Sequence, residues 1–302
     1  MSRRVALATY ASTPYLAPDD QLLPPALASL GINAGPAIWS DDSEPWREFD
    51  AVVIRSCWDY HLHFADFLAW LARLETAGVT VWNSPSLIRW NADKRYLLDL
   101  ARRGVATIPT MIVPHGRATD VEPFAIAEGW PRFVLKPTVS ASGYETHALS
   151  TPIDDAAYDA IARVTAIGDA LLQPFVDEVS HHGEYSFTFI DGEFSHATLK
   201  RAAPREFRVQ TEHGGSVEPV SAPRVLIEQA THVLQALPET PLYARVDGIA
   251  RGSAFLLMEL ELIEPNLFLG ESSGAAERLA AAIARRLSGG LASDEFTRRA
   301  SQ

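Results

Sequence analysis

Hydrophobic and polar positions alternate between strand-like and helix-like spacing through the first 85 residues. Short runs of apolar and β-branched side chains separate stretches in which apolar residues recur every three or four positions. The predicted strands are residues 5–10, 50–56 and 79–82, and the predicted helices are residues 19–30 and 64–74. Strands that alternate with helices predict a parallel sheet, whose ligands lie at the carboxyl ends of the strands.

After residue 85 the pattern is that of a mixed α+β fold. We expect helices at residues 86–103, 156–167, 225–237 and 275–287, and strands at residues 133–137, 170–176, 185–190, 193–200, 242–249 and 254–263. Asp191-Gly192 separates two alternating runs, which is a strong signal for a tight hairpin. We expect the tail, residues 288–302, to fray. The predicted fold class is therefore α/β followed by α+β.

Composition narrows the class of protein. The chain has 302 residues, 47% hydrophobic and 21% charged, which is typical of a folded protein with one large or two smaller domains. Its net charge of −12 argues against a nucleic-acid partner, because an acidic surface repels phosphate backbones. No apolar run reaches the roughly 18 residues of a membrane span, and the single cysteine, Cys57, excludes an internal disulfide. We expect a cytoplasmic protein, alone or as a homo-oligomer.

Lys136 ends an apolar strand and precedes a loop of small residues. A lysine beside buried apolar residues needs an anionic partner or a route to water. The backbone N–H groups of Ser140-Ala141-Ser142-Gly143 would close over a phosphate, as they do in other nest-like loops. The alternative is a lysine that only reaches solvent at a strand end.

Gln173-Pro174-Phe175-Val176 lies where another strand is expected to end, and Glu184 follows it. A strand exit through proline leaves backbone groups unpaired, so these would hydrogen-bond to an adenine edge, and Phe175 offers a stacking surface. The carboxylate of Glu184 would accept from ribose hydroxyls. An ordinary strand exit with a solvated acid explains the same residues.

Glu259 and Glu261 lie two positions apart in a predicted strand, so both point to the same face. Two carboxylates in so apolar a strand repel each other unless a cation lies between them. Mg²⁺ prefers oxygen ligands, and Asp247 at the end of the preceding strand would supply another. The alternative is an acidic stripe that faces solvent on an edge strand.

The order of these features resembles the ATP-grasp superfamily, close to its glutathione synthetase branch. Lys94 in a predicted helix, a second lysine in Val-Leu-Lys-Pro, the small-residue loop, the Gln-Pro-Phe-Val exit and the late acids follow one another as in that family. The resemblance covers nearly the whole chain. It implies a pre-ATP-grasp α/β domain at residues 1–85, a first ATP-grasp lobe at 86–176 and a second lobe at 177–302.

The resemblance also implies roles for individual residues. The expected ATP-binding residues are Lys94, Lys136, Ser140, Ser142, Gly143, Gln173, Pro174, Phe175, Val176 and Glu184. The expected Mg²⁺ ligands are Asp247, Glu259 and Glu261, and the expected catalytic cations facing the transferred phosphate are Arg201, Arg208 and Lys136. Glu261 replaces the commoner asparagine, which leaves Glu264 and Asn266 as alternative ligands. The lid loop carries one glycine where relatives carry several.

The resemblance implies a reaction as well. Family members transfer the γ-phosphate of ATP to a substrate carboxylate, and an amine or another nucleophile attacks the acylphosphate. We therefore expect an ADP-forming carbon–nitrogen ligase that uses ATP and Mg²⁺ and acts on a small amino-acid-like substrate. Phosphorylation of a hydroxyl, as in inositol-phosphate kinases with this architecture, is one alternative. A nucleotide-binding module without turnover is another.

The candidate substrate site is the segment Arg-Ser-Cys-Trp-Asp-Tyr that follows a first-domain strand. We expect Arg55 to bind a carboxylate and Asp59 an amine, while Trp58 and Tyr60 shape the site. Packing between domains is the alternative role for the two aromatic residues. The segment resembles a subgroup of the family that includes the O-ureido-serine cyclo-ligase of cycloserine biosynthesis, which implies amino-acid metabolism or antibiotic biosynthesis.

Overall fold

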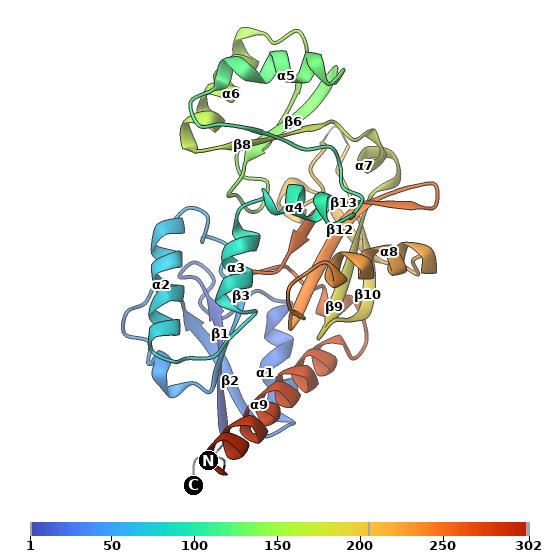
Figure 1. Ribbon diagram of the computed structural model, residues 1–302. Helices are drawn as coiled ribbons and strands as arrows, with labels where there is room; N and C mark the ends of the chain where they lie inside the picture. The colour runs from blue at the N-terminus through green and yellow to red at the C-terminus, as the bar shows by residue number, and fades with distance from the viewer. Residues whose placement is uncertain (1, 205, 300–302) are drawn as a thin grey trace.

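Three sheets organise the part of the chain that the computed structural model describes, residues 2–204 and 206–299 (Figure 1). The first sheet is parallel, in the order β2-β1-β3-β4, with β1 Arg3–Thr9, β2 Ile32–Ile38, β3 Ala51–Ser56 and β4 Val81–Trp82. The predicted strands of this sheet are confirmed, and β2 is an additional one. Gly35 and Pro36 obscure β2 in the sequence, and the structure tolerates Pro36 because β2 is an edge strand.

Helices cover both faces of the first sheet. Val5 and Leu7 of β1 pack toward α1 Leu23–Ala28 and α9 Ala275–Arg299, whereas Ala6 and Ala8 pack toward α2 Phe64–Thr76 (Figure 1). Burial on both faces explains why these strands read as continuous apolar runs rather than as alternating ones. The predicted end of the last helix at residue 287 is wrong, because α9 continues through 288–299. Residues 300–302 of the expected frayed tail lie outside the described residues.

The second sheet is antiparallel and forms a separate hydrophobic core with two helices. Its order is β5-β8-β6-β7, with β5 Met111–Val113, β6 Arg132–Pro137, β7 His147–Ser150 and β8 Ala170–Pro174. Its helices are α5 Val121–Ala127 and α6 Asp155–Ile167. The sequence predicted β6, β8 and α6. It missed the short β5, β7 and α5.

The third sheet is antiparallel and carries the late acids. Its order is β11-β10-β9-β12-β13, with β9 Glu184–Ile190, β10 Glu193–Arg201, β11 Ser216–Pro219, β12 Tyr243–Arg251 and β13 Ala254–Glu261. Helices α7 Asp177–His182 and α8 Arg224–Gln235 flank it. The predicted hairpin is confirmed: Asp191 and Gly192 have φ of 54° and 82°, as a tight two-residue turn between strands requires. The 3-10 turns are Asp20–Leu22, Trp46–Glu48, Ala118–Asp120, Thr211–His213 and Leu269–Glu271.

The single helix predicted at 86–103 is wrong. The chain forms α3 Pro85–Ala92 and α4 Tyr96–Arg102, with Asp93 in an extended conformation between them. Lys94 therefore lies in the break and not within a helix. Its backbone N–H donates to Thr138 O at 2.8 Å, a contact from a distant segment that no local pattern encodes.

Each sheet falls inside one of the three ranges expected for the domains, although α9 at the end of the chain packs against the first sheet. The boundaries 1–85, 86–176 and 177–302 remain a prediction. No helix within the described residues is long and apolar enough to cross a membrane.

Candidate active site

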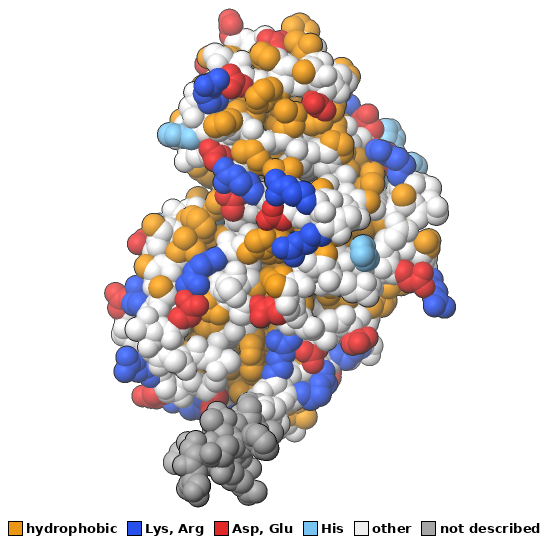
Figure 2. All heavy atoms as spheres, in the orientation of Figure 1, with side chains coloured by type: hydrophobic (Ala, Val, Ile, Leu, Met, Phe, Trp, Pro, Cys, Tyr) orange, Lys and Arg blue, Asp and Glu red, His pale blue; other side chains and the backbone are white. Residues whose placement is uncertain are grey.

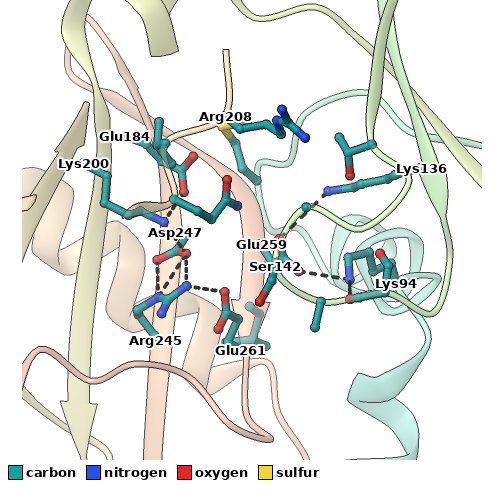
Figure 3. A pocket seen from close by; sticks show the side chains of 18 of the residues that line it. Lys94, Lys136, Ser142, Glu184, Lys200, Arg208, Arg245, Asp247, Glu259 and Glu261 are labelled. Atoms are coloured by element: carbon teal, nitrogen blue, oxygen red, sulfur yellow. Dashed lines mark hydrogen bonds and ion pairs between the residues drawn. The ribbon is translucent and has the colours of Figure 1, made fainter. Parts of the chain in front are cut away.

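A cavity opens where the three sheets approach one another. Its walls come from the segment after β3, the break between α3 and α4, β6 with the loop after it, the end of β8, and the inner face of β9, β10, β12 and β13. Figure 3 shows lysine, arginine and carboxylate side chains converging on this space. The cavity thus joins the predicted nucleotide, metal and substrate segments.

Strand register places four charged residues of β12 and β13 side by side. Arg245 and Asp247 share a face of β12, and their antiparallel partners on β13 are Glu261 and Glu259, respectively. The Arg245 Nη2 donates to Asp247 Oδ2 at 2.9 Å and also to the Glu261 carboxylate. Lys200 on β10 adds its Nζ at 2.8 Å from Asp247 Oδ2 and 2.6 Å from Glu184 Oε1.

Two lysines from distant segments share one carboxylate on the opposite side of the cavity (Figure 3). Lys94 Nζ lies 3.2 Å from Glu259 Oε1, and Lys136 Nζ lies 3.9 Å from Glu259 Oε2. Burial and the neighbouring Lys94 lower the pKa of Lys136, although Glu259 opposes the shift. The two lysines lower the pKa of Glu259 against the effect of burial. A second anion at this place would relieve the repulsion between the lysines.

The carboxyl groups of the cavity differ in how far nearby cations offset the effects of burial and of neighbouring carboxylates on their pKa values. Burial raises the pKa of Asp247, but Arg245 and Lys200 outweigh that effect and hold it well below its usual range. Burial and the nearby Asp247 and Glu259 carboxylates raise the pKa of Glu261 to about 7, despite Arg245. Burial and Glu261 raise the pKa of Glu264 to about 8. The side of the cavity that holds Glu261 and Glu264 therefore carries more negative than positive charge, although Arg245 pairs with Glu261.

The acids fit a Mg²⁺ ion that is shared with phosphate. Among the residues described, no group of three or more His, Cys, Asp or Glu side chains is arranged to hold a metal by itself. Mg²⁺ in nucleotide sites is commonly held by one or two carboxylates together with phosphate oxygens, so a closed protein cage is not required. The raised pKa of Glu261 marks uncompensated negative charge that a divalent cation would balance. Asp247, Glu259 and Glu261 would hold the ion.

The residues predicted to bind ATP all line this cavity. Gly143 has a φ of 69°, and a Cβ there would lie 3.3 Å from both Arg208 Cδ and His213 Nε2, so the lid loop packs tightly against the segment that carries Arg208. The Phe175 ring makes a cation–π contact with Arg132, whose guanidinium carbon lies 3.8 Å from the ring centroid. That these residues bind ATP remains a prediction.

Comparison with known proteins identifies the family. Residues 5–83 match the family described as D-cycloserine synthetase DcsG, N-terminal domain. Cycloserine biosynthesis protein DcsG of Streptomyces lavendulae is 35% identical over 289 residues, which cover 89% of this chain and 95% of DcsG. The chain belongs to the ATP-grasp ligases, in the group of DcsG. The predicted resemblance and enzyme class are confirmed.

Solved structures agree with this ATP-grasp assignment. The crystal structure of D-cycloserine synthetase DcsG aligns with a TM-score of 0.85 at 32% identity, covering 94% of this chain and 99% of that one. A D-alanine–D-alanine ligase from Bacillus anthracis aligns with a TM-score of 0.69 at 15% identity, covering 94% and 97% of the two chains. The latter likeness supports the fold alone. The predicted α/β and α+β fold class is confirmed.

Arg201 does not face the cavity of this ATP-grasp ligase. Its Nε donates to Glu218 Oε1 at 3.2 Å, and 47% of its side chain is exposed. Alternation along β10 turns Lys200 inward and Arg201 outward, so the predicted catalytic role of Arg201 lacks structural support. Arg208 does line the cavity, where it pairs with Glu206 at 2.9 Å.

Of the four residues predicted to bind the substrate, two line the cavity and two do not. Trp58 and Tyr60 line the cavity, as expected, but Arg55 and Asp59 do not. Arg55 is fully buried, and its guanidinium donates to Asp20 Oδ1 at 2.8 Å and to Pro265 O at 2.7 Å. Asp59 Oδ1 accepts from Trp39 Nε1 at 2.8 Å. Both charged groups are engaged within the fold, which corrects their predicted contacts with substrate.

Two cavity cations were missed from the sequence, Lys200 and Arg245. The spacing Arg245-Val246-Asp247 carried a usable signal, because residues two apart in a strand share a face and Asp247 was already a candidate. The sequence analysis expected Arg201 to face the cavity, whereas Lys200 does. Nothing in Leu199-Lys200-Arg201 fixes which of the two cations points inward. Glu264, considered only as an alternative metal ligand, also lines the cavity.

Proposed function

We propose that this ATP-grasp ligase activates the carboxylate of a small amino-acid-like substrate as an acylphosphate, which a nitrogen of the same molecule then attacks. The products are a cyclic amide, ADP and phosphate. O-ureido-serine, the substrate implied by the subgroup resemblance, carries both the carboxylate and the nitrogen. The similarity to DcsG, which is named for cycloserine biosynthesis, supports this choice.

The observation that carries the proposal is the arrangement of cations around one cavity. Lys94 and Lys136 approach Glu259 from one side, and Lys200 and Arg245 approach Asp247 from the other. Bound ATP with Mg²⁺ would supply the phosphoryl group and neutralise its charge. The protein's own task is to position two oxygens, stabilise charge and exclude water, and a buried set of fixed cations suits that task.

The end of the cavity that lies toward Trp58 and Tyr60 fits a small molecule rather than a polymer. Trp58 and Tyr60 form part of its wall. Several elements surround the space, so it is a cavity and not an open groove along the surface. Figure 2 shows basic and acidic side chains interspersed over the visible face, with no continuous basic stripe on it. We place the substrate carboxylate between these aromatic residues and the cations.

The proposal is tested by incubating the protein with ATP, Mg²⁺ and a pool of amino acids that includes O-ureido-serine, with and without hydroxylamine. ADP release together with a trapped hydroxamate supports an acylphosphate. A stable phosphorylated alcohol would instead identify a kinase. No ADP release under any condition would favour a binding module.

Two variants connect this assay to the cavity. Lys136→Ala and Glu259→Gln are expected to abolish ADP release while circular dichroism shows an unchanged fold, because each removes a charge from the shared lysine–carboxylate group. Wild-type turnover in either variant would contradict the site assignment.

A further inference from the structure

Glu264 differs from the other acids of the cavity. Four of them form ion pairs with lysine or arginine: Glu184, Asp247, Glu259 and Glu261. Within residues 2–204 and 206–299, the Glu264 carboxylate has no ion-pair partner from another residue. A half-buried carboxylate without a paired cation loses part of its hydration uncompensated, so its place in a ligand cavity points to a cation brought by the ligand.

Three side chains contact the backbone that carries Glu264, and one of them, Tyr243, shares its single hydroxyl proton between Ile263 O and Ile54 O. Tyr243 Oη lies 2.8 Å from Ile263 O, Trp58 Nε1 donates to Glu264 O at 3.1 Å, and Arg55 Nη2 donates to Pro265 O at 2.7 Å. Three consecutive carbonyl groups are thereby fixed. A side chain on such a segment is pre-organised to hold a ligand group, because little conformational entropy is lost on binding.

The surroundings of Glu264 suit a monovalent organic cation. Trp58 and Tyr60 line the same cavity, and burial together with the Glu264 carboxylate raises the pKa of the Tyr60 hydroxyl. Aromatic faces attract an ammonium group and cover its alkyl part.

We propose that Glu264 binds the α-ammonium group of the substrate and so selects amino acids over carboxylic acids that lack the amine. The proposal rests on the proposed function, because it assumes an amino-acid-like substrate in this cavity. It transfers to Glu264 the role that the sequence suggested for Asp59, whose carboxylate is bonded to Trp39. The carboxylate of the substrate would then extend toward the cations.

The test compares two compounds and two variants. The compounds are O-ureido-serine and its des-amino analogue, 3-(ureidooxy)propanoate, which keeps every group except the α-amine. The variants are Glu264→Gln and the control Asp59→Asn, in a neighbouring acid outside the cavity. The measurements are kcat/KM from ADP release, the Mg²⁺ half-saturation concentration, and calorimetric binding of O-ureido-serine in the presence of a non-hydrolysable ATP analogue.

We expect wild type to prefer O-ureido-serine, and Glu264→Gln to reduce that preference roughly 10- to 100-fold, the usual effect of losing a hydrogen bond to a charged group. Turnover of the analogue should change little, and Asp59→Asn should keep the wild-type preference.

Equal loss for both compounds, or a raised Mg²⁺ half-saturation concentration, would overturn the proposal by showing a structural or metal-binding role. If wild type neither binds nor converts O-ureido-serine but converts another amino acid, the named substrate fails, and the same comparison with that amino acid and its des-amino form decides the role of Glu264. If no amino acid binds, both proposals fail.

Discussion

Lys200 and Arg201 are chain neighbours that β10 turns in opposite directions. Lys200 is buried against Glu184 and Asp247, whereas Arg201 pairs with Glu218 at the surface. The electrostatic value of a cation depends on this difference, since a charge in a water-excluded site acts far more strongly than one that solvent screens.

Substitution of this pair tests the orientation of β10. We expect Lys200→Met to lower kcat/KM by roughly 100-fold or more, comparable to the loss of one buried electrostatic donor in other enzymes. Arg201→Met serves as the matched control and should stay within about twofold of wild type, as surface ion pairs contribute little. Initial rates of ADP release measure both. A larger loss in Arg201→Met than in Lys200→Met would reverse the assignment.

Glu264 should also make stability depend on pH. Its pKa is about 8 in the folded chain against an ordinary 4.5, so the folded state keeps a proton that the unfolded state loses as pH rises. The unfolded state then binds fewer protons, and the free energy of unfolding falls between pH 4.5 and 8 by up to about 1.4 kcal/mol per pH unit from this group.

We therefore expect ligand-free Glu264→Gln to be more stable than wild type, with a difference in Tm that grows from pH 5 to pH 8 and then levels off. Glu277→Gln, on an exposed position of α9, should follow the wild-type curve. Differential scanning fluorimetry across this range provides the measurement. A constant offset between Glu264→Gln and wild type would contradict the argument. A gain in stability with a loss of selectivity is the usual consequence of neutralising a functional group.

At the scale of elements, Gly183 joins α7 to the strand that carries Glu184. Its φ is 83°, and a Cβ would lie 2.7 Å from Lys200 O on the neighbouring strand. Gly252, in the turn between β12 and β13, has a φ of 63° but nothing within 4 Å of the same position. Both glycines therefore have a positive φ, but Gly183 combines it with a ψ of 177°, a region open essentially to glycine alone, and also lies close to Lys200 O.

We expect Gly252→Ala to cost about 1–2 kcal/mol of unfolding free energy, the price of a left-handed backbone, and to leave catalysis unchanged. Gly183→Ala should cost more and should also raise the KM for ATP, because the added methyl group displaces the paired positions Glu184 and Lys200. Urea denaturation and steady-state kinetics separate the two effects. Identical behaviour of the two variants would show that the contact with Lys200 O is easily relieved.

Local patterns predicted those elements whose burial is periodic along the chain. The apolar strands β1, β3 and β6 and the Asp191-Gly192 hairpin follow from such patterns. The break at Lys94 does not, because it depends on a hydrogen bond to Thr138 from another segment.

The cavity shows the same limit. The acids and lysines were identifiable from apolar strands interrupted by charge. The inward position of Lys200 instead of Arg201 depends on strand register, and the position of Asp59 outside the cavity depends on a tertiary hydrogen bond to Trp39. The sequence therefore predicted the kinds of charged group better than the particular residues.

At the scale of the whole molecule, side chains from one sheet cap backbone groups of another. Asn83 Nδ2 donates to Tyr243 O at 2.9 Å and to Leu262 O at 2.8 Å, and Asn83 Oδ1 accepts from Leu242 N–H. Tyr243 Oη lies 2.7 Å from Ile54 O in β3, in addition to its contact with Ile263 O. The Tyr243 hydroxyl thus connects the first sheet with the turn that carries Glu264, as Arg55 of β3 also does through Pro265 O.

We expect Tyr243→Phe to lower the free energy of unfolding by about 1–3 kcal/mol, since removing the hydroxyl leaves a buried carbonyl oxygen without a donor. Because the same hydroxyl contacts the turn at Ile263, the variant should also raise the KM for the proposed substrate, O-ureido-serine, more than the KM for ATP. Tyr15→Phe, at a side chain that is 79% exposed, is the control and should change neither quantity. Urea unfolding and substrate titrations measure them. If Tyr243→Phe loses stability but keeps both KM values, the hydroxyl joins the sheets without positioning the substrate end of the cavity.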